Sequence, residues 1–202
     1  MEKIINSTLD YYNQGAQKFT DGTQSIDFKE TQNKFLNRLP EGATILDFGC
    51  GSGRDTKYFL DKGYKVDAID GSEELCKIAS EYTGIKVKKT LFEELCEINK
   101  YDGIWACSSI LHLPKDQLMD VLHKMLDATK NNGYIYTSFK YGDYEGFRNE
   151  RYFTDFTEEL FSEFIKEISS IHIIECWITN DVRPGRSDEK WLNLILRKAD
   201  ML

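Results

Sequence analysis

The chain has 202 residues, of which 41% are hydrophobic and 30% charged, a composition that fits one globular domain with its own apolar core. Its net charge of −8 leaves no surplus of lysine and arginine to neutralise a phosphate backbone, so a nucleic-acid substrate is not expected. Aromatic residues make up 13% of the chain, which is enough to make their positions informative about function.

Helices alternate with short apolar strands over the first two thirds of the chain. Strands separated by helices of about 10–15 residues indicate right-handed βαβ units and a mainly parallel sheet. The predicted helices cover residues 7–19, 28–39, 55–62, 72–82 and 114–129. The predicted strands cover residues 44–48, 64–69, 85–89, 103–107 and 134–139.

The last third has a different pattern. A helix over residues 157–168 precedes two long apolar strands, 171–179 and 191–197, which indicate an antiparallel hairpin at one edge of the sheet. Residues 140–155 have no regular periodicity, and a loop of that length is expected to be functional. We expect one domain over residues 1–202.

The cysteines and the N-terminus indicate the compartment. The five cysteines are widely spaced and form no C-x-x-C pair, so neither a disulfide framework nor a metal site is predicted. The N-terminus turns polar early, and no stretch approaches the roughly 18–20 apolar residues of a membrane span. We therefore expect a cytoplasmic protein that has no membrane partner.

A glycine-rich run, ILDFGCGSG over residues 45–53, follows the first predicted strand. Alternate glycines let the backbone turn tightly against a ligand. The carboxyl end of a strand in an open α/β sheet is also where ligands bind. The spacing excludes a dinucleotide fingerprint, because a G-x-G-x-x-G pattern that starts at Gly49 would require glycine at Arg54.

The pattern Asp47-x-Gly49-x-Gly51-x-Gly53 resembles the first motif of class I S-adenosylmethionine-dependent methyltransferases. The resemblance extends over most of the chain and implies a Rossmann-like, mostly parallel seven-stranded sheet with helices on both faces. It implies S-adenosylmethionine as the cofactor and S-adenosylhomocysteine as the product. The three glycines and Cys50 would cradle the methionine portion, and Asp47 would help to hold its amino group, directly or through a water molecule. The run from Gly51, GSGRD, is similar to small-molecule members of the tellurite-resistance type.

The resemblance also assigns the nucleoside part of the cofactor. Asp70 ends the second predicted strand and would accept hydrogen bonds from the ribose hydroxyls, with a cap of the next helix as the alternative. Gly71 and Ser72 follow it, and Gly71 replaces the bulky residue that often covers adenine. Leu91 stands where an acidic residue is common, so Leu91 and Phe92 would hold adenine by apolar packing. A simple core role is the alternative for Phe92.

The fourth predicted strand and the loop after it resemble the family segment that flanks the methyl group. The backbone at Ala106 and Cys107 is expected to face the cofactor. A lone cysteine on an apolar strand is usually a small hydrophobic residue, so Cys107 is given no nucleophilic role. His112 is the candidate base for an acceptor hydroxyl or amine, with a structural hydrogen-bonded role as the alternative.

The N-terminal segment YYNQGAQKF, residues 11–19, resembles the helix that lids the cofactor in many small-molecule members, within a helical lid over residues 1–40. Tyr12 and Phe19 are seven residues apart and share one helical face, which an ordinary packing face explains equally well. Arg54 is placed to meet the cofactor carboxylate, with a solvated first-turn position as the alternative.

Aromatic and cationic side chains gather after the fifth predicted strand. Rings bury flat surface and guanidinium groups clamp carboxylate or phosphate, so this mixture predicts a pocket for a planar or anionic small molecule. A charged surface loop with aromatic anchors is the alternative. The candidate acceptor-binding residues are Tyr141, Tyr144, Phe147, Arg148, Arg151 and Tyr152. Lys140, Phe153, Arg183, Arg186 and Trp191 have the same character.

Methyl transfer from a sulfonium is an in-line displacement, for which orientation alone contributes about 7–11 kcal/mol. The lack of an obvious catalytic dyad is therefore no argument against an enzyme. The sequence predicts a methyltransferase, monomeric or homodimeric, that acts on an O, N or S atom of a small-molecule acceptor. The alternative is a catalytically silent S-adenosylmethionine-binding sensor or partner subunit.

Overall fold

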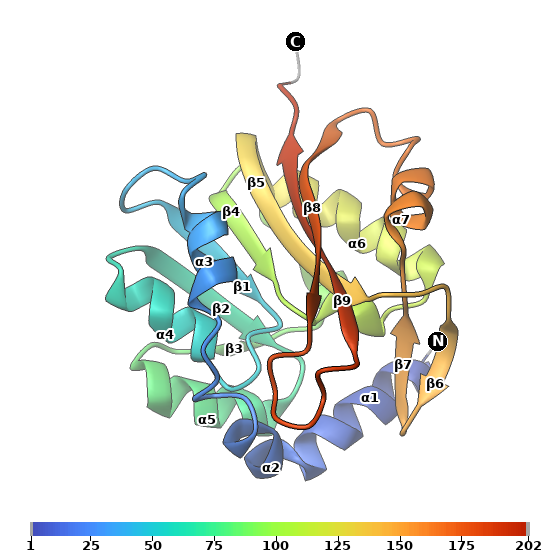
Figure 1. Cartoon of the computed structure of the whole chain (residues 1–202). Helices are drawn as coiled ribbons and strands as arrows, with labels where there is room; N and C mark the ends of the chain where they lie inside the picture. Colours follow the sequence, from blue (N-terminus) through green and yellow to red (C-terminus); the bar gives the residue numbers. More distant parts are fainter. Residues whose placement is uncertain (1, 201–202) are drawn as a thin grey trace.

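A seven-stranded sheet with the strand order β3-β2-β1-β4-β5-β9-β8 forms the centre of the molecule (Figure 1). The computed structural model describes the backbone of residues 2–200 and the side chains of residues 4–200. The first five strands pair in parallel, whereas β9 is antiparallel to both β5 and β8. The strands are β1 (Thr44–Phe48), β2 (Lys65–Asp70), β3 (Lys88–Lys89), β4 (Tyr101–Ala106), β5 (Thr129–Lys140), β8 (Ile171–Asn180) and β9 (Lys190–Lys198).

Helices cover both faces of the sheet (Figure 1). The helices are α1 (Glu2–Gln14), α2 (Ala16–Asp21), α3 (Lys29–Leu36), α4 (Arg54–Asp61), α5 (Glu73–Thr83), α6 (Lys115–Ala128) and α7 (Glu158–Phe164). Two short 3₁₀ turns, η1 (Phe92–Glu94) and η2 (Ile110–His112), follow β3 and β4.

Successive strand residues point to opposite faces, and both faces are apolar. Ile45 and Trp105 pack in one core with side chains of α3 and α4. Leu46 and Ile104 pack in a second core with side chains of α6. Burial on both faces explains why the central strands are mainly apolar, and the strand order confirms the predicted α/β fold with its antiparallel C-terminal hairpin.

Several predicted elements have different bounds in the structure, among them α3, β5 and α7, and two more differ in form. The helix expected over residues 7–19 is two helices, because Gly15 separates α1 from α2. A Cβ at Gly15 would lie 3.1 Å from the carbonyl oxygen of Tyr11, so a larger residue would crowd the end of α1. The strand expected over residues 85–89 is reduced to the two residues of β3.

Residues 140–155 were expected to form an irregular loop. This prediction is wrong, because the segment contains a second sheet of two strands. Strands β6 (Glu145–Arg148) and β7 (Arg151–Thr154) pair antiparallel. Asn149 and Glu150 join them, both with positive φ, of 47° and 66°, as a two-residue hairpin turn requires. Strands of four residues are too short to give a clear alternation, which is why the sequence pattern missed them. The hairpin lies beside α1 (Figure 1), where the hydroxyl of Ser7 donates to the carbonyl of Glu150 at 2.6 Å.

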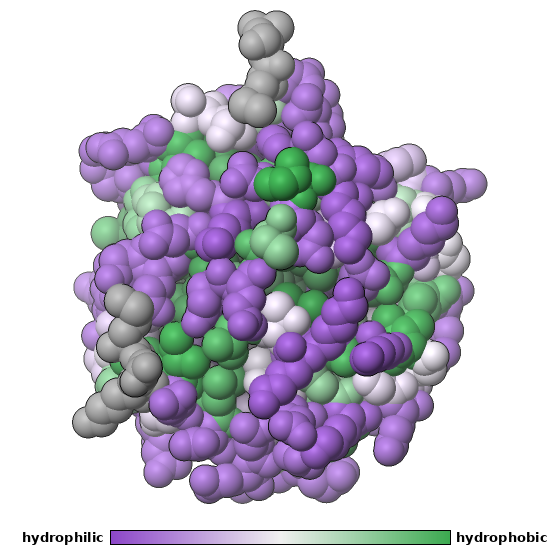
Figure 2. All heavy atoms as spheres, turned by 180° about the vertical axis from the view of Figure 1, so that it is seen from behind, coloured by the Kyte–Doolittle hydropathy of each residue, from purple (hydrophilic) through white to green (hydrophobic). Residues whose placement is uncertain are grey.

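Hydrophilic side chains cover most of the face seen from behind, and apolar side chains show there only in smaller patches (Figure 2). Within residues 2–200, no helix has the length and apolar character needed to cross a membrane.

Candidate active site

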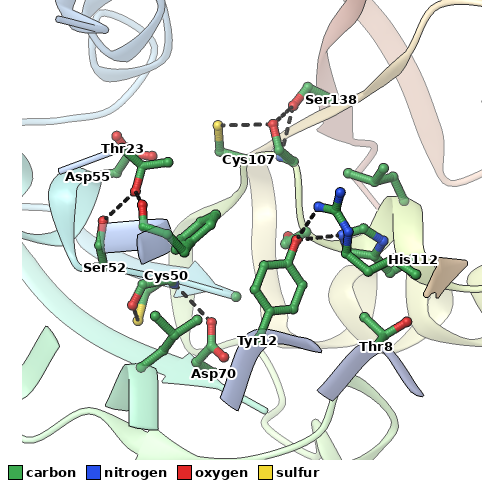
Figure 3. Close-up of a pocket in the computed structure, with 18 of the residues that line it drawn as sticks. Thr8, Tyr12, Thr23, Cys50, Ser52, Asp55, Asp70, Cys107, His112 and Ser138 are labelled. Atoms are coloured by element: carbon green, nitrogen blue, oxygen red, sulfur yellow. Dashed lines mark hydrogen bonds between the residues drawn. The ribbon is translucent and has the colours of Figure 1, made fainter. Parts of the chain in front are cut away.

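A large pocket lies over the carboxyl-terminal ends of the parallel strands, and different elements build its two ends. The β2 end follows β1, β2 and β3 and is lined by Gly49, Cys50, Gly51, Ser52, Asp70, Gly71, Leu91 and Phe92. The β9 end follows β5, β6 and β8 and is lined by Ser138, Lys140, Arg151, Asp181, Arg183, Arg186, Trp191 and Asn193. Lining residues from other elements include Tyr12, Phe19, Arg54, Cys107 and His112. In Figure 3, Tyr12 lies between Asp70 and His112.

The floor of the β2 end is backbone that tolerates no side chain. Gly49 and Gly51 have φ values of 85° and 55°, in the left-handed region that favours glycine. A Cβ on Gly49 would lie 2.5 Å from the Cβ of Ser109, and a Cβ on Gly51 would lie 3.0 Å from the ring of Phe19. Both positions therefore require glycine, and both line the pocket, with Phe19 of α2 next to Gly51.

The carboxylate of Asp70 fixes the glycine loop and also faces the pocket. Its two oxygens accept hydrogen bonds from the backbone N–H groups of Gly51, at 2.9 Å, and Ser72, at 2.8 Å. Burial raises the pKa of Asp70, and these hydrogen bonds only partly oppose the shift. Each carboxylate oxygen has a second lone pair, so Asp70 can also accept hydrogen bonds from a ligand.

Apolar side chains flank this carboxylate. A Cβ on Gly71 would lie 2.7 Å from Leu9 of α1 and 3.4 Å from Leu91. Leu9 therefore fills the place of the bulky residue that is missing at position 71. This role of Leu9 was not predicted from the sequence, because nothing in its local pattern links it to Gly71. Phe92 lines the pocket and also packs on Phe48, with ring centroids 4.7 Å apart.

Arg54 is held rigidly at the pocket wall. It donates to Asp55 at 2.7 and 2.9 Å, and its guanidinium lies 4.6 Å from the ring centroid of Phe28. Its side chain is only 19% exposed, which excludes the solvated alternative. Burial acts to raise the pKa of Asp55, but the charge of Arg54 and hydrogen bonds from Arg54, Trp105 and Gln32 hold that pKa below its ordinary value.

Tyr12 and His112 form the contact between α1 and the end of β4. His112 Nδ1 lies 2.6 Å from the carbonyl oxygen of Tyr152, which can only accept, so Nδ1 carries the hydrogen. His112 Nε2 therefore accepts from the Tyr12 hydroxyl at 2.9 Å (Figure 3). Burial lowers the pKa of His112 to about 4, so the ring is neutral at pH 7. A group with that pKa whose lone pair is occupied is a poor base, and this geometry favours the hydrogen-bonded role.

Ion pairs organise the β9 end. Asp181 accepts from Arg183 at 2.5 and 2.9 Å and from the indole of Trp191 at 3.1 Å. Lys140 Nζ lies 3.5 Å from Asp181 and also contacts Glu189. Burial acts to raise the pKa of Asp181, but hydrogen bonds from Arg183 and Trp191 hold it well below its ordinary value. Asp181 and Glu189 were not identified from the sequence, where Arg183, Arg186 and Trp191 of this segment were noted.

A model of the methyltransferase domain family matches residues 45–133. An uncharacterized methyltransferase of Staphylococcus carnosus is 26% identical over 69% of this chain and 72% of its own length. The N-terminal Xaa-Pro-Lys N-methyltransferase 1 of Xenopus tropicalis is 34% identical over 50% of this chain. The match spans about half of that relative's length, 53%. The solved 1,6-didemethyltoxoflavin-N1-methyltransferase of Burkholderia thailandensis, with bound 1,6-didemethyltoxoflavin and S-adenosylhomocysteine, has a TM-score of 0.78. It is 21% identical, over 98% of this chain and 88% of that chain.

The family model and these relatives support the assignment of the chain as a class I S-adenosylmethionine-dependent methyltransferase. Its cofactor is S-adenosylmethionine. The β2 end of the methyltransferase fits this cofactor, since it combines an open glycine cradle, a carboxylate with free lone pairs and an apolar flank of Leu9, Leu91 and Phe92.

Four residues that the motif had assigned to the cofactor do not line the pocket of the methyltransferase. The carboxyl group of Asp47 is buried behind the loop, where the hydroxyl of Thr56 donates to it at 2.5 Å. Burial and the neighbouring Asp55 raise the pKa of Asp47. Ala106 is fully buried within β4.

The other two of these four residues serve helix α5. A Cβ at Gly53 would lie 2.8 Å from Thr83 of α5, so this glycine permits close packing of two helices. Ser72 caps α5 by accepting from the backbone N–H of Leu75 at 3.2 Å, and its hydroxyl donates to Asn13 at 2.7 Å. The resemblance placed both residues near the cofactor, but Gly53 packs against α5 and the hydroxyl of Ser72 is used by Leu75 and Asn13.

Of the six residues expected to bind the acceptor, only Arg151 lines the pocket. Tyr141, Tyr144 and Phe147 are exposed. Arg148 pairs with Asp155 at 2.5 and 3.0 Å. The hydroxyl of Tyr152 donates to Glu145 at 3.2 Å, away from the pocket. Alternation along β7 explains the outcome, because it brings Arg151 and Phe153 to the pocket and turns the residue between them outward.

Proposed function

We propose that this methyltransferase transfers the methyl group of S-adenosylmethionine to an O, N or S atom of a small molecule bound at the β9 end of the pocket. The observation that carries the proposal is that one continuous pocket joins the glycine cradle to the cationic β9 end. Donor and acceptor can therefore lie side by side in one enclosed space, as an in-line displacement requires.

We assign the cofactor to the β2 end. Asp70 accepts the ribose hydroxyls, and the cradle of Gly49, Cys50 and Gly51 lies against the methionine portion. Leu91 and Phe92, together with Leu9, cover adenine. Arg54 faces the cofactor carboxylate with the donors that Asp55 leaves free. The bound cofactor supplies a methyl group on a cationic sulfonium.

The side chains between the two ends position the reactants and exclude water. Tyr12 and Phe19 cover the pocket from α1 and α2, and their rings pack edge to face with centroids 5.3 Å apart. His112 is neutral and already accepts from Tyr12, so in our proposal it fixes α1 and takes no proton from the acceptor. The acceptor must then present a lone pair of its own, as a neutral amine or an ionised hydroxyl or thiol does.

A small acceptor is supported by the cover that α1, α2, β7 and the β8–β9 loop form over the pocket. It is also supported by the toxoflavin-type methyltransferase, which shares the fold and whose structure contains a small heterocyclic acceptor. The silent sensor is not favoured, because the relatives and neighbours described above are methyltransferases.

Two measurements test the proposal. Calorimetric titration should detect binding of S-adenosylmethionine and S-adenosylhomocysteine to the wild-type protein. Methyl-labelled cofactor is then supplied with either the small-molecule filtrate or the macromolecular retentate of a cell extract. We expect labelled product from the filtrate. If label entered only the retentate, the acceptor would be a macromolecule and not a small molecule. Cofactor binding without transfer to either fraction would favour the sensor.

A further inference from the structure

Arg151, the first residue of β7, differs from every other cation that lines the pocket. Each of the others has a carboxylate partner within 4.0 Å: Arg54 has Asp55, Lys140 and Arg183 have Asp181, and Arg186 has Glu189. Arg151 makes no ion pair with any side chain among residues 4–200. Its charge therefore faces the pocket without a counter-ion.

The guanidinium of Arg151 is held in place by aromatic rings. Its carbon lies 4.2 Å from the ring centroid of Tyr11 and 5.1 Å from that of Phe153. Nη1 is 3.4 Å from the hydroxyl oxygen of Tyr12. Aromatic faces stabilise a cation and restrict its orientation, but they do not satisfy its N–H groups. The side chain is thus oriented in advance for a partner that the described chain does not supply.

One of its donors is both buried and unsatisfied. Nε of Arg151 has no hydrogen-bond partner within the described residues. Leaving a buried donor unpaired costs free energy, and native proteins do so rarely. Together with the outer nitrogen beside it, Nε forms the planar fork that binds a carboxylate or phosphate through two parallel hydrogen bonds.

The charge balance of the β9 end points the same way. Three cations, Lys140, Arg183 and Arg186, share the two carboxylates of Asp181 and Glu189. This cluster therefore retains one positive charge, and Arg151 adds a second. In a protein with a net charge of −8, a pocket end with this local excess is suited to an anion.

We infer that the methyl acceptor is a small oxyanion, and that Arg151 binds its carboxylate or phosphate group. This inference rests on the proposed function, since it names the acceptor class of the same pocket. The cofactor carries a carboxylate of its own, which is the other possible partner of Arg151. The anion would sit next to Tyr12, so its binding would also stabilise the position of α1.

The test uses benzoate and benzamide, two planar probes of the same shape that differ in charge. Each is titrated into the protein with and without S-adenosylhomocysteine. We expect benzoate to bind at least about tenfold more tightly than benzamide, as a charge-assisted fork implies. Arg151→Gln should abolish this preference, and Arg151→Lys, which keeps the charge but loses the fork, should retain part of it. Equal binding of the two probes to the wild-type protein would overturn the inference.

Arg148→Gln is the matched control, because Arg148 lies opposite Arg151 in the hairpin but is paired with Asp155. This variant should keep the full preference for benzoate. A second comparison shows whether Arg151 binds an anionic group of the acceptor or the carboxylate of the cofactor. If Arg151→Gln weakens S-adenosylhomocysteine about tenfold and leaves the carboxylate-free methylthioadenosine unchanged, the guanidinium holds the cofactor and the inference is wrong.

The two proposals fail in different ways. If wild-type protein binds no S-adenosylhomocysteine, the proposed function fails. The probe titrations without cofactor still decide whether Arg151 selects an oxyanion. If cofactor binding and methyl transfer are both found, a labelled product that carries no negative charge on anion exchange would overturn the inference alone.

Discussion

The two ends of the pocket are held together in different ways. At the β2 end, Asp70 and the glycine loop are joined through backbone N–H groups, and the loop in turn hydrogen-bonds to the backbone of β2. At the β9 end, side-chain ion pairs around Asp181 hold the wall. Side-chain ion pairs can change with each substitution, whereas a backbone cradle requires glycines and one carboxylate. We infer that the first end suits one constant cofactor and that the second end sets the acceptor.

The charges of the two ends differ as well. Asp70 and Glu93 line the β2 end, and Arg151 and the cluster around Lys140 line the β9 end. In Figure 3, Asp70 and His112 lie on opposite sides of Tyr12. A cationic cofactor and an anionic acceptor would each meet the opposite charge, which favours one orientation of the pair in the pocket.

The largest expected effect tests the ion-paired end. Asp181→Asn should lower the free energy of unfolding by about 3 kcal/mol, because it leaves the part-buried Arg183 without its carboxylate partner and leaves Lys140 and Arg186 with Glu189 alone. The side chain of Asp181 is only 2% exposed. Urea unfolding measures the loss, and Asp188→Asn, an exposed change of the same charge in the same loop, should have little effect. Binding of S-adenosylhomocysteine should stay within about twofold, since the two ends are built separately. A large loss of cofactor binding in Asp181→Asn would contradict the view that the two ends are built separately.

Asp70→Ala tests the backbone-held end. The change should weaken S-adenosylhomocysteine about 100-fold, or about 2.7 kcal/mol, because the ribose acceptor and the anchor of Gly51 are lost together. Asp67→Ala removes the same charge from the same strand, but its carboxylate contacts Lys100 at 2.7 Å, outside this pocket. Calorimetry should find that control unchanged. Equal losses in the two variants would contradict the assignment of Asp70.

The pH dependence of stability tests the contact between the ends. His112 has a folded pKa of about 4, below its ordinary value of about 6.5, because burial disfavours the charged ring. Between these values the unfolded chain binds a proton that the folded protein does not, so stability falls as the pH falls. From pH 7 to pH 5 this one group should cost about 2 kcal/mol.

The matched variants are His112→Gln and His123→Gln, the latter at an exposed position of α6. Unfolding at both pH values should give a smaller loss for His112→Gln than for the wild-type protein. The loss in His123→Gln should match the wild type. An unchanged pH dependence in His112→Gln would show that the ring is not buried in its neutral form.

Tyr12→Phe should have the smallest effect. It removes the hydroxyl that donates to His112 and accepts from Arg151, which should cost about 1 kcal/mol of unfolding free energy. Tyr11→Phe is the neighbouring control, because Tyr11 contacts Arg151 through its ring and not its hydroxyl. Urea unfolding compares the two. A loss in Tyr11→Phe as large as in Tyr12→Phe would mean that the hydroxyl of Tyr12 does not join the two ends.

Several residues that the sequence assigned to one site line the β2 end of one pocket, because their positions depend on local strand ends. Gly49, Gly51 and Asp70 each follow a strand end, and strand ends of a parallel sheet meet at one edge. The same motif also assigned Gly53 and Asp47 to the cofactor, but Gly53 packs against α5 and the carboxylate of Asp47 accepts from Thr56. Spacing along the chain does not reveal which neighbour a side chain turns toward.

The aromatic residues show the limit of composition. Their density after β5 predicted an acceptor pocket, yet Tyr141, Tyr144 and Phe147 are exposed on or beside a short hairpin. That hairpin was missed because its strands have only four residues each. Of the aromatic residues that follow β5 directly, Phe153 of β7 lines the pocket, and further rings come from α1, α2 and β9, at Tyr12, Phe19 and Trp191.

By itself, the sequence determined the α/β fold, because apolar periodicity reflects local backbone requirements, and the resemblance of its glycine motif to that of class I methyltransferases implied the family and the cofactor. Tertiary structure alone decided that Leu9 covers Gly71, that Asp181 gathers the cations of the β9 end, and that Arg151 is left without a counter-ion. These contacts join segments far apart in the chain. They depend on how strands and helices pack against one another, which the pattern of a single segment does not determine.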